Sequence, residues 1–263
     1  MPELPEVETI VRGLTAVSGA RIDALQVLDS RLEIPADEIS GRTIEAIRRR
    51  GKYIVFHLSG GRLLIVHLRM SGRLTLTRSP AEKKYTRFIL HFDRGKVYFI
   101  NPRRLGTVEY SRSGFPHLLG VEPLSTAFTA EWLEGVSAAS RAQIKPLLMD
   151  QKRIAGLGNI YAAEALWRGG IDPRRVAARL TKEEIQALHP AIVQVLHEAI
   201  DRMGTTLGRS VADYRDVSGD YGDFQGRLAV YGRKGEPCRR CRAVIERIVQ
   251  AGRSTFFCPG CQG

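Results

Sequence analysis

The chain has no long apolar run and few acidic residues. No stretch approaches the ~20 apolar residues of a membrane-spanning helix, and no basic-then-apolar leader opens the sequence. We therefore expect a soluble cytoplasmic protein without a membrane partner. Internal repeats, low-complexity segments, a Ser-His-Asp order and a two-metal carboxylate cluster are also absent, and the six histidines are scattered. These absences argue against solenoids and against common hydrolase chemistries.

Acidic residues number 28 against 40 basic ones, so the formal net charge is +12, and the pI is near 9.9. Such an excess indicates a polyanionic partner, with nucleic acid ahead of an acidic membrane surface. With 263 residues, 43% of them hydrophobic, the chain can bury a full core. Its length favours two domains rather than one.

Only four cysteines are present, and all lie near the end of the chain as two C-x2-C pairs, Cys238 with Cys241 and Cys258 with Cys261. In a cytosolic chain this spacing predicts zinc rather than disulfides. Four thiolates complete the tetrahedron of one zinc ion and leave no position for water, so the metal is expected to be structural. Residues 244–249 and 254–257 alternate like a two-stranded ribbon with Arg253 at its turn. Arg253 would then face away from the metal, although it could equally be one more exposed arginine.

Residues 20–110 alternate in strand fashion, with hairpins predicted at 54–58 with 63–68 and at 88–92 with 97–100. Helical patterns follow at about 129–135, 140–150, 159–168 and 181–203. We expect an α+β fold: an N-terminal β-sandwich or flattened barrel with a packed N-terminal helix, then a helical domain that ends in a four-cysteine zinc ribbon. The expected divisions are a catalytic domain at 1–127, a helical DNA-binding domain at 128–226 and the ribbon at 227–263. Residues 205–226 form a loop too long for a simple connector.

Two segments are basic and are predicted to be loops that reach a partner, namely residues 48–52 and 101–106. A third segment, 156–161, is a glycine-rich turn that opens a helix at Asn159. It is not a dinucleotide fingerprint, because Tyr161 stands where the third glycine would be. Its backbone N–H groups and the positive end of the helix dipole suit a phosphate. A plain corner between two helices is the alternative.

The first residues offer the best available catalytic pair. Removal of Met1 would leave Pro2 with a free secondary amine next to the carboxyl of Glu3. A free α-amino group has a pKa of roughly 8, which a helix dipole would lower and the neighbouring glutamates would raise. The sequence does not decide which effect is larger. An amine that attacks a sugar carbon forms a Schiff base, the covalent route open to a nitrogen nucleophile.

Together these segments resemble the bacterial formamidopyrimidine-DNA glycosylases. The resemblance extends in order from residue 2 to residue 261. Its motifs are residues 2–9 (PELPEVET), 67–72 (HLRMSG), 101–106 (NPRRLG), 158–162 (GNIYA), 231–238 (YGRKGEPC) and the cysteine pairs. It implies a helix-two-turn-helix domain and a bacterial, nucleoid-associated monomer that binds damaged double-stranded DNA. The implied enzyme removes oxidised purines, chiefly 8-oxoguanine and formamidopyrimidines, and then cuts the strand.

The resemblance also implies residue roles. Pro2 is the nucleophile at the sugar C1′, and Glu3 is the acid that assists ring opening and departure of the base. Lys52 matches the lysine assigned to β-elimination, and Arg253 the arginine assigned to δ-elimination. The implied DNA contacts are the phosphate-binding Asn159 together with Lys52 and Arg253, the wedge residues Met70 and Arg103, and the basic positions Arg104 and Arg141. Arg103 is expected to meet the orphaned cytosine.

The chain departs from the family pattern at three positions. Leu105 replaces the usual phenylalanine of the wedge, and Tyr85 replaces a common DNA-contacting histidine. Asp223 lies in the 205–226 loop, the expected lid over the damaged base, where other members vary. One rival interpretation is an endonuclease VIII-type glycosylase for oxidised pyrimidines. Another is a non-catalytic zinc-ribbon DNA-binding protein, which would have no need of the Pro2–Glu3 terminus.

Overall fold

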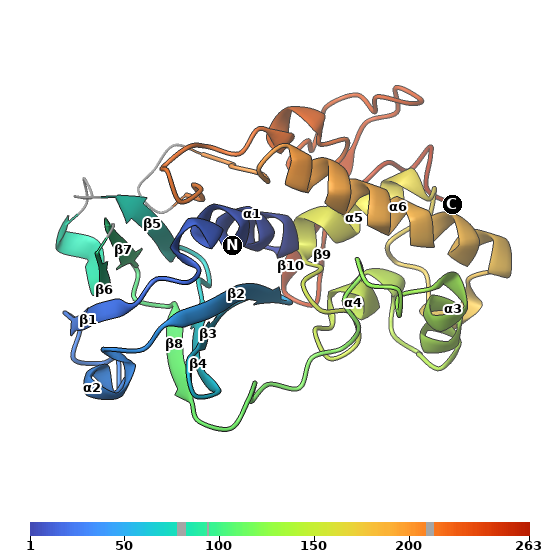
Figure 1. Cartoon of the computed structure of the whole chain (residues 1–263). Helices are drawn as coiled ribbons and strands as arrows, with labels where there is room; N and C mark the ends of the chain where they lie inside the picture. The colour runs from blue at the N-terminus through green and yellow to red at the C-terminus, as the bar shows by residue number, and fades with distance from the viewer. Residues whose placement is uncertain (78–82, 94, 209–212) are drawn as a thin grey trace. The chain divides into compact units, whose positions relative to one another are not determined.

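The computed structural model describes residues 1–77, 83–93, 95–208 and 213–263. The chain folds into two compact units. The first unit contains residues 1–117 and 200–225, and the second contains 118–199 and 226–263. The 205–226 loop therefore belongs, for nearly all of its length, with the N-terminal residues. Figure 1 shows the order of the elements along the chain. The predicted boundaries near 127 and 226 stay a prediction.

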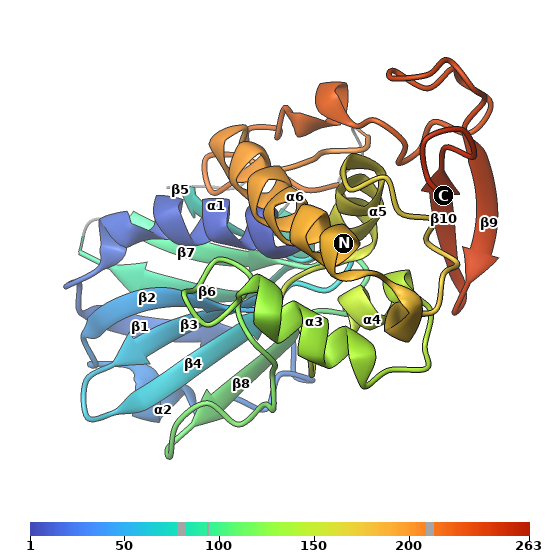
Figure 2. The ribbon, with the colours of Figure 1, turned by 90° about the vertical axis from the view of Figure 1, so that its right-hand side faces the viewer.

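The first unit is built on two four-stranded antiparallel sheets, which confirms the predicted sandwich. One has the order β1-β6-β7-β5 and the other β2-β3-β4-β8 (Figure 2). The strands are β1 (Ile22–Val27), β2 (Ile44–Arg50), β3 (Tyr53–Leu58), β4 (Arg62–His67), β5 (Arg73–Thr77), β6 (Thr86–Phe92), β7 (Gly95–Ile100) and β8 (Thr107–Ser111). Both predicted hairpins, β3–β4 and β6–β7, are present. Residue 94 of the second hairpin's turn lies outside the described residues.

The basic run 48–52 is not the loop that we expected. Residues 48–50 belong to β2 and pair with β3 as far as Arg50 opposite Tyr53. Only Gly51 and Lys52 form the turn, and Gly51 has a φ of 57°. A two-residue hairpin turn needs positive φ, which glycine adopts without strain. The tight turn lets the strand continue through the charged residues.

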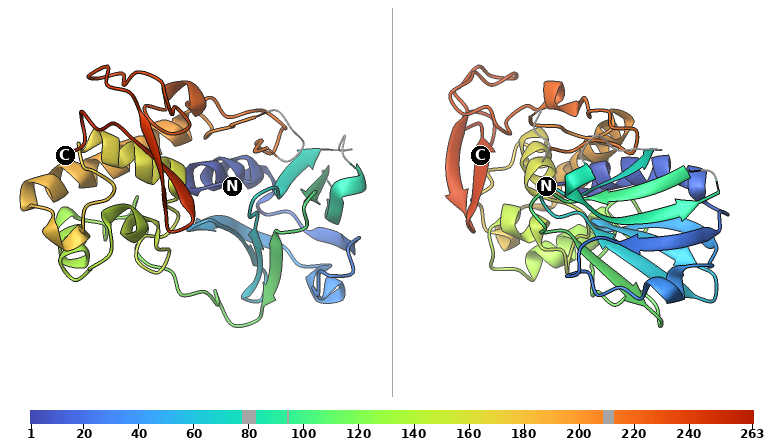
Figure 3. Two further views of the ribbon diagram at one scale, coloured as in Figure 1. Left: turned by 180° about the vertical axis from the view of Figure 1, so that it is seen from behind. Right: turned by 90° about the vertical axis from the view of Figure 1, so that its left-hand side faces the viewer.

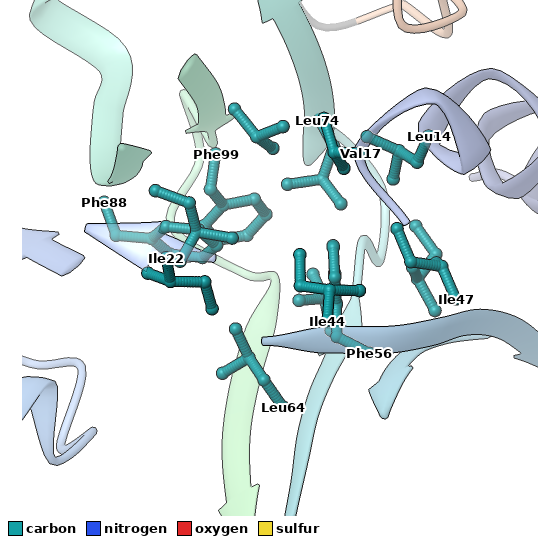
Figure 4. Packing of buried hydrophobic residues seen from close by; sticks show 14 of the residues in the cluster. Leu14, Val17, Ile22, Ile44, Ile47, Phe56, Leu64, Leu74, Phe88 and Phe99 are labelled. Atoms are coloured by element: carbon teal, nitrogen blue, oxygen red, sulfur yellow. The ribbon is translucent and has the colours of Figure 1, made fainter. Parts of the chain in front are cut away.

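Helix α1 (Leu4–Leu14) packs on the sandwich, as predicted. Val7, Ile10 and Leu14 lie at helical spacing and are fully buried in one core with residues of both sheets. Figure 4 shows Leu14 near Val17, Ile47 and Leu74 of this core, and the rings of Phe88 and Phe99 stack 5.2 Å apart. The short elements of this part are η1 (Thr15–Val17), α2 (Ala36–Ile39) and η2 (Lys83–Tyr85).

The second unit is helical and ends in the ribbon. Its helices are α3 (Ala130–Ala138), α4 (Ile144–Met149), α5 (Asn159–Arg168), η3 (Ala177–Arg179) and most of α6 (Lys182–Asp201), and η4 (Phe224–Arg227) spans the boundary between the units. The predicted capping box at Thr181 and Glu184 is formed. Strands β9 (Glu246–Gln250) and β10 (Arg253–Phe257) make an antiparallel ribbon that contacts α5 (Figure 3). The α+β fold class is confirmed.

Candidate active site and nucleic-acid interface

Pro2 and Glu3 are both buried at the start of α1. Glu3 is the N-cap residue, and its backbone N–H donates to the Glu6 carboxylate at 2.7 Å. In return, the Glu3 side chain accepts from the backbone N–H of Glu6. Such a reciprocal capping box satisfies two N–H groups that a helix start leaves unpaired. The helix start therefore holds the predicted acid in one defined conformation, next to the buried Pro2.

Glu6 also connects the catalytic terminus to the long loop. Its other carboxylate oxygen accepts from the backbone N–H of Thr205 at 2.8 Å. A Cβ at Gly204, which has a φ of +80°, would lie 2.7 Å from that same oxygen. Farther along the loop, the Val217 carbonyl accepts from Leu76 in β5. The described part of the predicted lid thus lies against α1 and β5, and residues 209–212 lie outside the described residues.

Lys52 is only 6% exposed in the β2–β3 turn. Arg49, on the same hairpin, makes an ion pair with Glu8 of α1 at 2.9 Å. The same guanidinium donates to the Gly51 carbonyl at 3.2 Å. These contacts join α1, which begins two residues after Pro2, to the turn that carries Lys52.

The wedge residues lie on two loops, residues 68–72 and 101–106, which we call the wedge loops. Met70 and Leu105 are each 50% exposed, so their apolar side chains are available to a partner. Two buried polar residues join the loops: Ser71 accepts from the backbone N–H of Arg103 at 3.3 Å and lies 3.4 Å from the amide oxygen of Asn101. The three residues predicted to form the wedge, Met70, Arg103 and Leu105, therefore lie on two loops that share a support.

His67 supports the first wedge loop. Burial, with the charges of Arg69 and Lys52 beside it, lowers the pKa of His67 to about 3. The neutral ring accepts at Nδ1 from the backbone N–H of Arg69 at 3.0 Å. Arg69 has a φ of 52°, a left-handed conformation that costs a non-glycine residue energy. Reading the sequence did not single out His67, although it opens the HLRMSG motif.

Asn159 and the strand that begins with Arg253 lie together in the second unit. The amide of Asn159 donates to the Ser254 carbonyl at 3.0 Å. Lys145, 1% exposed, donates to the amide oxygen of Asn159 at 2.6 Å and to the Thr255 hydroxyl at 2.7 Å. A buried ammonium needs such acceptors to offset its desolvation. Lys145 was not predicted, and the only signal is a lysine inside an apolar segment.

Glu164 is a second buried charge that the sequence analysis missed. Its carboxylate accepts three backbone N–H groups, from Ala229 at 2.7 Å, Val230 at 3.0 Å and Tyr231 at 2.8 Å. Complete burial raises the pKa of Glu164, against the lowering effect of these bonds. The residue fixes the segment that leads into the ribbon. Its signal is a charge in the otherwise apolar run 160–166.

The four cysteine sulfurs lie within 4.8 Å of one another. The Sγ atoms of Cys238 and Cys261 are 3.7 Å apart, and those of Cys241 and Cys258 are 3.4 Å apart. Tetrahedral zinc with Zn–S bonds of about 2.3 Å requires sulfur separations of about 3.8 Å. The cluster therefore fits one zinc ion with four thiolate ligands, as predicted.

The remaining predicted contact residues range from partly buried to exposed. Arg104 is half-exposed and lies 3.4 Å from the Asp29 carboxylate. Tyr85 is partly buried, with the Lys84 ammonium 4.9 Å from its ring centre. Arg141 is exposed just before α4, and Arg253 is exposed at the first position of β10.

Fold and sites together define a class, the zinc-ribbon DNA glycosylases with an N-terminal sandwich and a helix-two-turn-helix unit. Models of three families match: the formamidopyrimidine-DNA glycosylase N-terminal domain over residues 1–108, its H2TH domain over 119–210, and the zinc finger found in FPG and IleRS over 235–263. The chain belongs to the formamidopyrimidine-DNA glycosylase family. The resemblance, the enzyme class and the zinc site inferred from the sequence are confirmed.

Relatives match along the entire chain. A Chloroflexus aurantiacus protein named formamidopyrimidine-DNA glycosylase is 46% identical to this chain, and the match covers 100% of this chain and 98% of that protein. A Ruegeria pomeroyi protein of the same name is 41% identical, and the match covers 100% of both chains. The MutM (Fpg) crystal structure from Thermus thermophilus aligns with a TM-score of 0.90 at 41% identity, over 100% of this chain and 99% of that one. The complex of a Lactococcus lactis FPG mutant with Fapy-dG-containing DNA aligns with a TM-score of 0.89 at 34% identity, with 99% of each chain covered.

Proposed function

We propose that this chain is a bifunctional DNA glycosylase and abasic-site lyase that removes oxidised purines from duplex DNA and then cleaves the strand. The observation that carries the proposal is the buried Pro2–Glu3 terminus, held by its capping box in a chain that matches the family from end to end. The net charge of +12 supports a polyanionic substrate. Because the relatives are bacterial proteins, we place the proposed repair activity in the cytosol, at the nucleoid.

Pro2 and Glu3 supply the chemistry of base removal. The lone pair of the Pro2 nitrogen forms a bond to C1′, and the glycosidic bond breaks with its electrons leaving on the base, which takes up the proton that the amine gives up. Glu3 donates a proton to the ring oxygen as the sugar opens, which leaves an iminium between Pro2 and C1′. This step requires that Met1 be removed, because a peptide bond would delocalise the lone pair.

Lys52 and Arg253 act in strand cleavage. The iminium withdraws electrons, so that loss of a C2′ proton expels the 3′ phosphate, and a second elimination expels the 5′ phosphate. We assign the first elimination to Lys52 and the second to Arg253. Both side chains, with Asn159, also bind the phosphates around the extruded nucleotide.

The wedge loops and the lid make room for this chemistry. A base must leave the stack before it can be excised, and an inserted side chain fills the gap. Met70 and Leu105 supply exposed apolar bulk, and Arg103 faces the orphaned cytosine. Tyr85, Arg104 and Arg141 add contacts to the backbone. One zinc ion on the four cysteines would stabilise the ribbon that carries Arg253.

The test is borohydride trapping on duplex DNA with 8-oxoguanine opposite cytosine. The expected result is a covalent protein–DNA product whose cross-linked peptide, identified by mass spectrometry, carries the DNA on Pro2. A variant with one residue added before Pro2 is the matched control and should give no product. A cross-link on Lys52 with Pro2 unmodified would overturn the mechanism.

The rival interpretations predict different outcomes. An endonuclease VIII-type enzyme would cross-link to duplexes with oxidised pyrimidines in preference to 8-oxoguanine. A non-catalytic DNA-binding protein would bind these duplexes and give no cross-link with any of them.

A further inference from the structure

Asp29 is a buried carboxylate at the end of β1 that none of the roles above uses. Its side chain is 7% exposed, although it has three arginines around it. The segment that carries it is held by β6, because the backbone N–H groups of Leu28 and Asp29 both donate to the Arg87 carbonyl, at 2.8 and 3.1 Å. A buried charge must be compensated, so the identity of its partners shows what it holds.

Two of the three arginines connect Asp29 to the second wedge loop: Arg87 contacts it, and Arg104 belongs to it. Arg87, with its side chain 8% exposed, lies 3.7 Å from the Asp29 carboxylate. Its Nε donates to the carbonyl of Asn101, the first residue of that loop, at 3.0 Å. Arg104, inside the loop, lies 3.4 Å from the same carboxylate oxygen as Arg87. One carboxylate thus holds the loop at its first residue and near its tip.

The third arginine is local. Arg31 donates from its backbone N–H and its Nε to Asp29, both at 3.3 Å. Burial alone would raise the pKa of Asp29, but these bonds and the charges of Arg104 and Arg31 lower it below its ordinary value. The carboxylate is therefore ionised at neutral pH and attracts the arginines as an anion.

Arg104 has an unfavourable backbone conformation, and this explains why the loop needs an external contact. Its φ of 55° is left-handed, a conformation that is unfavourable for a residue with a side chain. That conformation separates Arg103 from Leu105 in the wedge. The ion pair with Asp29 stabilises Arg104 in a position that its own backbone preference disfavours.

We propose that Asp29 is a positioning residue for opposite-base selection: through Arg87 and Arg104 it holds the second wedge loop so that Arg103 meets the orphaned base in one orientation. The inference rests on the proposed function, in which Arg103 contacts that base. A buried ion pair can select one conformation without adding net stability. Removal of Asp29 should therefore loosen the loop and lower selectivity. It also leaves the buried Arg87 without its counter-charge, which costs stability, so selectivity is read as a ratio within one preparation.

The test measures equilibrium dissociation constants for duplexes that carry a stable abasic-site analogue opposite cytosine or opposite adenine. Asp29→Asn should lower the preference for cytosine by about tenfold, the scale of one hydrogen bond to a charged group. Asp29→Glu, which keeps the charge and shifts it by one methylene, should give an intermediate preference. Because the preference is a ratio within one preparation, a reduced folded fraction cancels.

Glu38→Gln is the matched control. It adds the same unit of charge and also breaks an ion pair with an arginine, Arg112, at an exposed position outside the wedge loops. Its cytosine preference should equal that of the unmodified protein. In Arg103→Ala the preference should be lost, and adding Asp29→Asn to that variant should lower it no further.

The outcomes separate this inference from the proposed function. An unchanged cytosine preference in Asp29→Asn, or a further loss in the double variant, would overturn the role of Asp29. Binding preference is read without any excision, so a protein that fails to cross-link 8-oxoguanine DNA would contradict the proposed function alone.

Discussion

Glu3 caps α1, and in the proposed mechanism it also donates a proton as the sugar ring opens. In Glu3→Gln the amide oxygen can still accept from the backbone N–H of Glu6, so the helix start and DNA binding should be retained. Excision of 8-oxoguanine should fall at least about 100-fold, the usual contribution of a general acid. Cleavage at a pre-formed abasic site should fall less. Single-turnover rates on the two substrates measure the difference, and equal losses would argue against an acid role.

The proposed role of the Pro2 amine can be tested by removing the proline ring as well as by adding a residue before it. Pro2→Gly keeps an amine at the N-terminus but exchanges a secondary amine for a primary one, whose Schiff base can lose its proton and its charge. We expect a slower but measurable excision and cleavage. Complete retention of the rate would show that the ring is dispensable, and trapping yield against time is the measurement.

Lys145 is a buried residue of the second unit whose loss should lower stability. Lys145→Met would leave the amide oxygen of Asn159 and the hydroxyl of Thr255 without their donor. The expected loss in the free energy of unfolding is about 1–3 kcal/mol, measured by urea denaturation. DNA affinity should fall for damaged and undamaged duplexes alike, because Asn159 is assigned to a phosphate. A loss confined to damaged DNA would contradict that assignment.

At the scale of elements, the wedge loops combine exposed apolar tips with buried polar supports. Leu105→Phe restores the aromatic ring usual in the family. Since Leu105 is 50% exposed, the larger side chain should be tolerated in the free protein. Stacking on a base is worth about 1–3 kcal/mol, so binding to a duplex with an abasic-site analogue should tighten. Weaker binding with an unchanged melting temperature would show that the leucine is the better wedge here.

At the scale of the whole molecule, the metal and the charge govern DNA binding. Cys258→Ser removes one of four zinc ligands, and ribbon folding depends on the ion. We expect elemental analysis to show zinc lost and DNA binding abolished, while the sandwich stays folded because its core contains no ribbon residue. Active protein without zinc would contradict the structural role.

The salt dependence of DNA binding is a separate prediction for the unmodified protein. The logarithm of its association constant for DNA should fall linearly with the logarithm of the salt concentration, with a slope of about −0.9 per phosphate contact.

Local patterns in the sequence determined the sandwich strands, the helices, the capping box and the zinc ligands. Each depends on residues a few positions apart: alternation along a strand, helical spacing, or C-x2-C. The motifs also predicted catalytic roles for Pro2 and Glu3 and a wedge role for Met70, Arg103 and Leu105, and these roles stay predictions. The assignment of residues 48–50 to a loop was wrong, because charge was weighed above the two-residue turn at Gly51 that lets β2 continue.

Only the tertiary structure decided which buried polar groups support these motifs. Ser71 meets Arg103, Glu6 meets Thr205, and Lys145 meets Thr255, across 32, 199 and 110 positions of the chain. Asp29 meets Arg104 in the same way, and nothing in its neighbours along the chain marks it. A buried charge needs a compensating partner, and the packing of the sheets and helices decides which residue lies close enough to serve as one. The local periodicity of the sequence therefore does not predict these pairs.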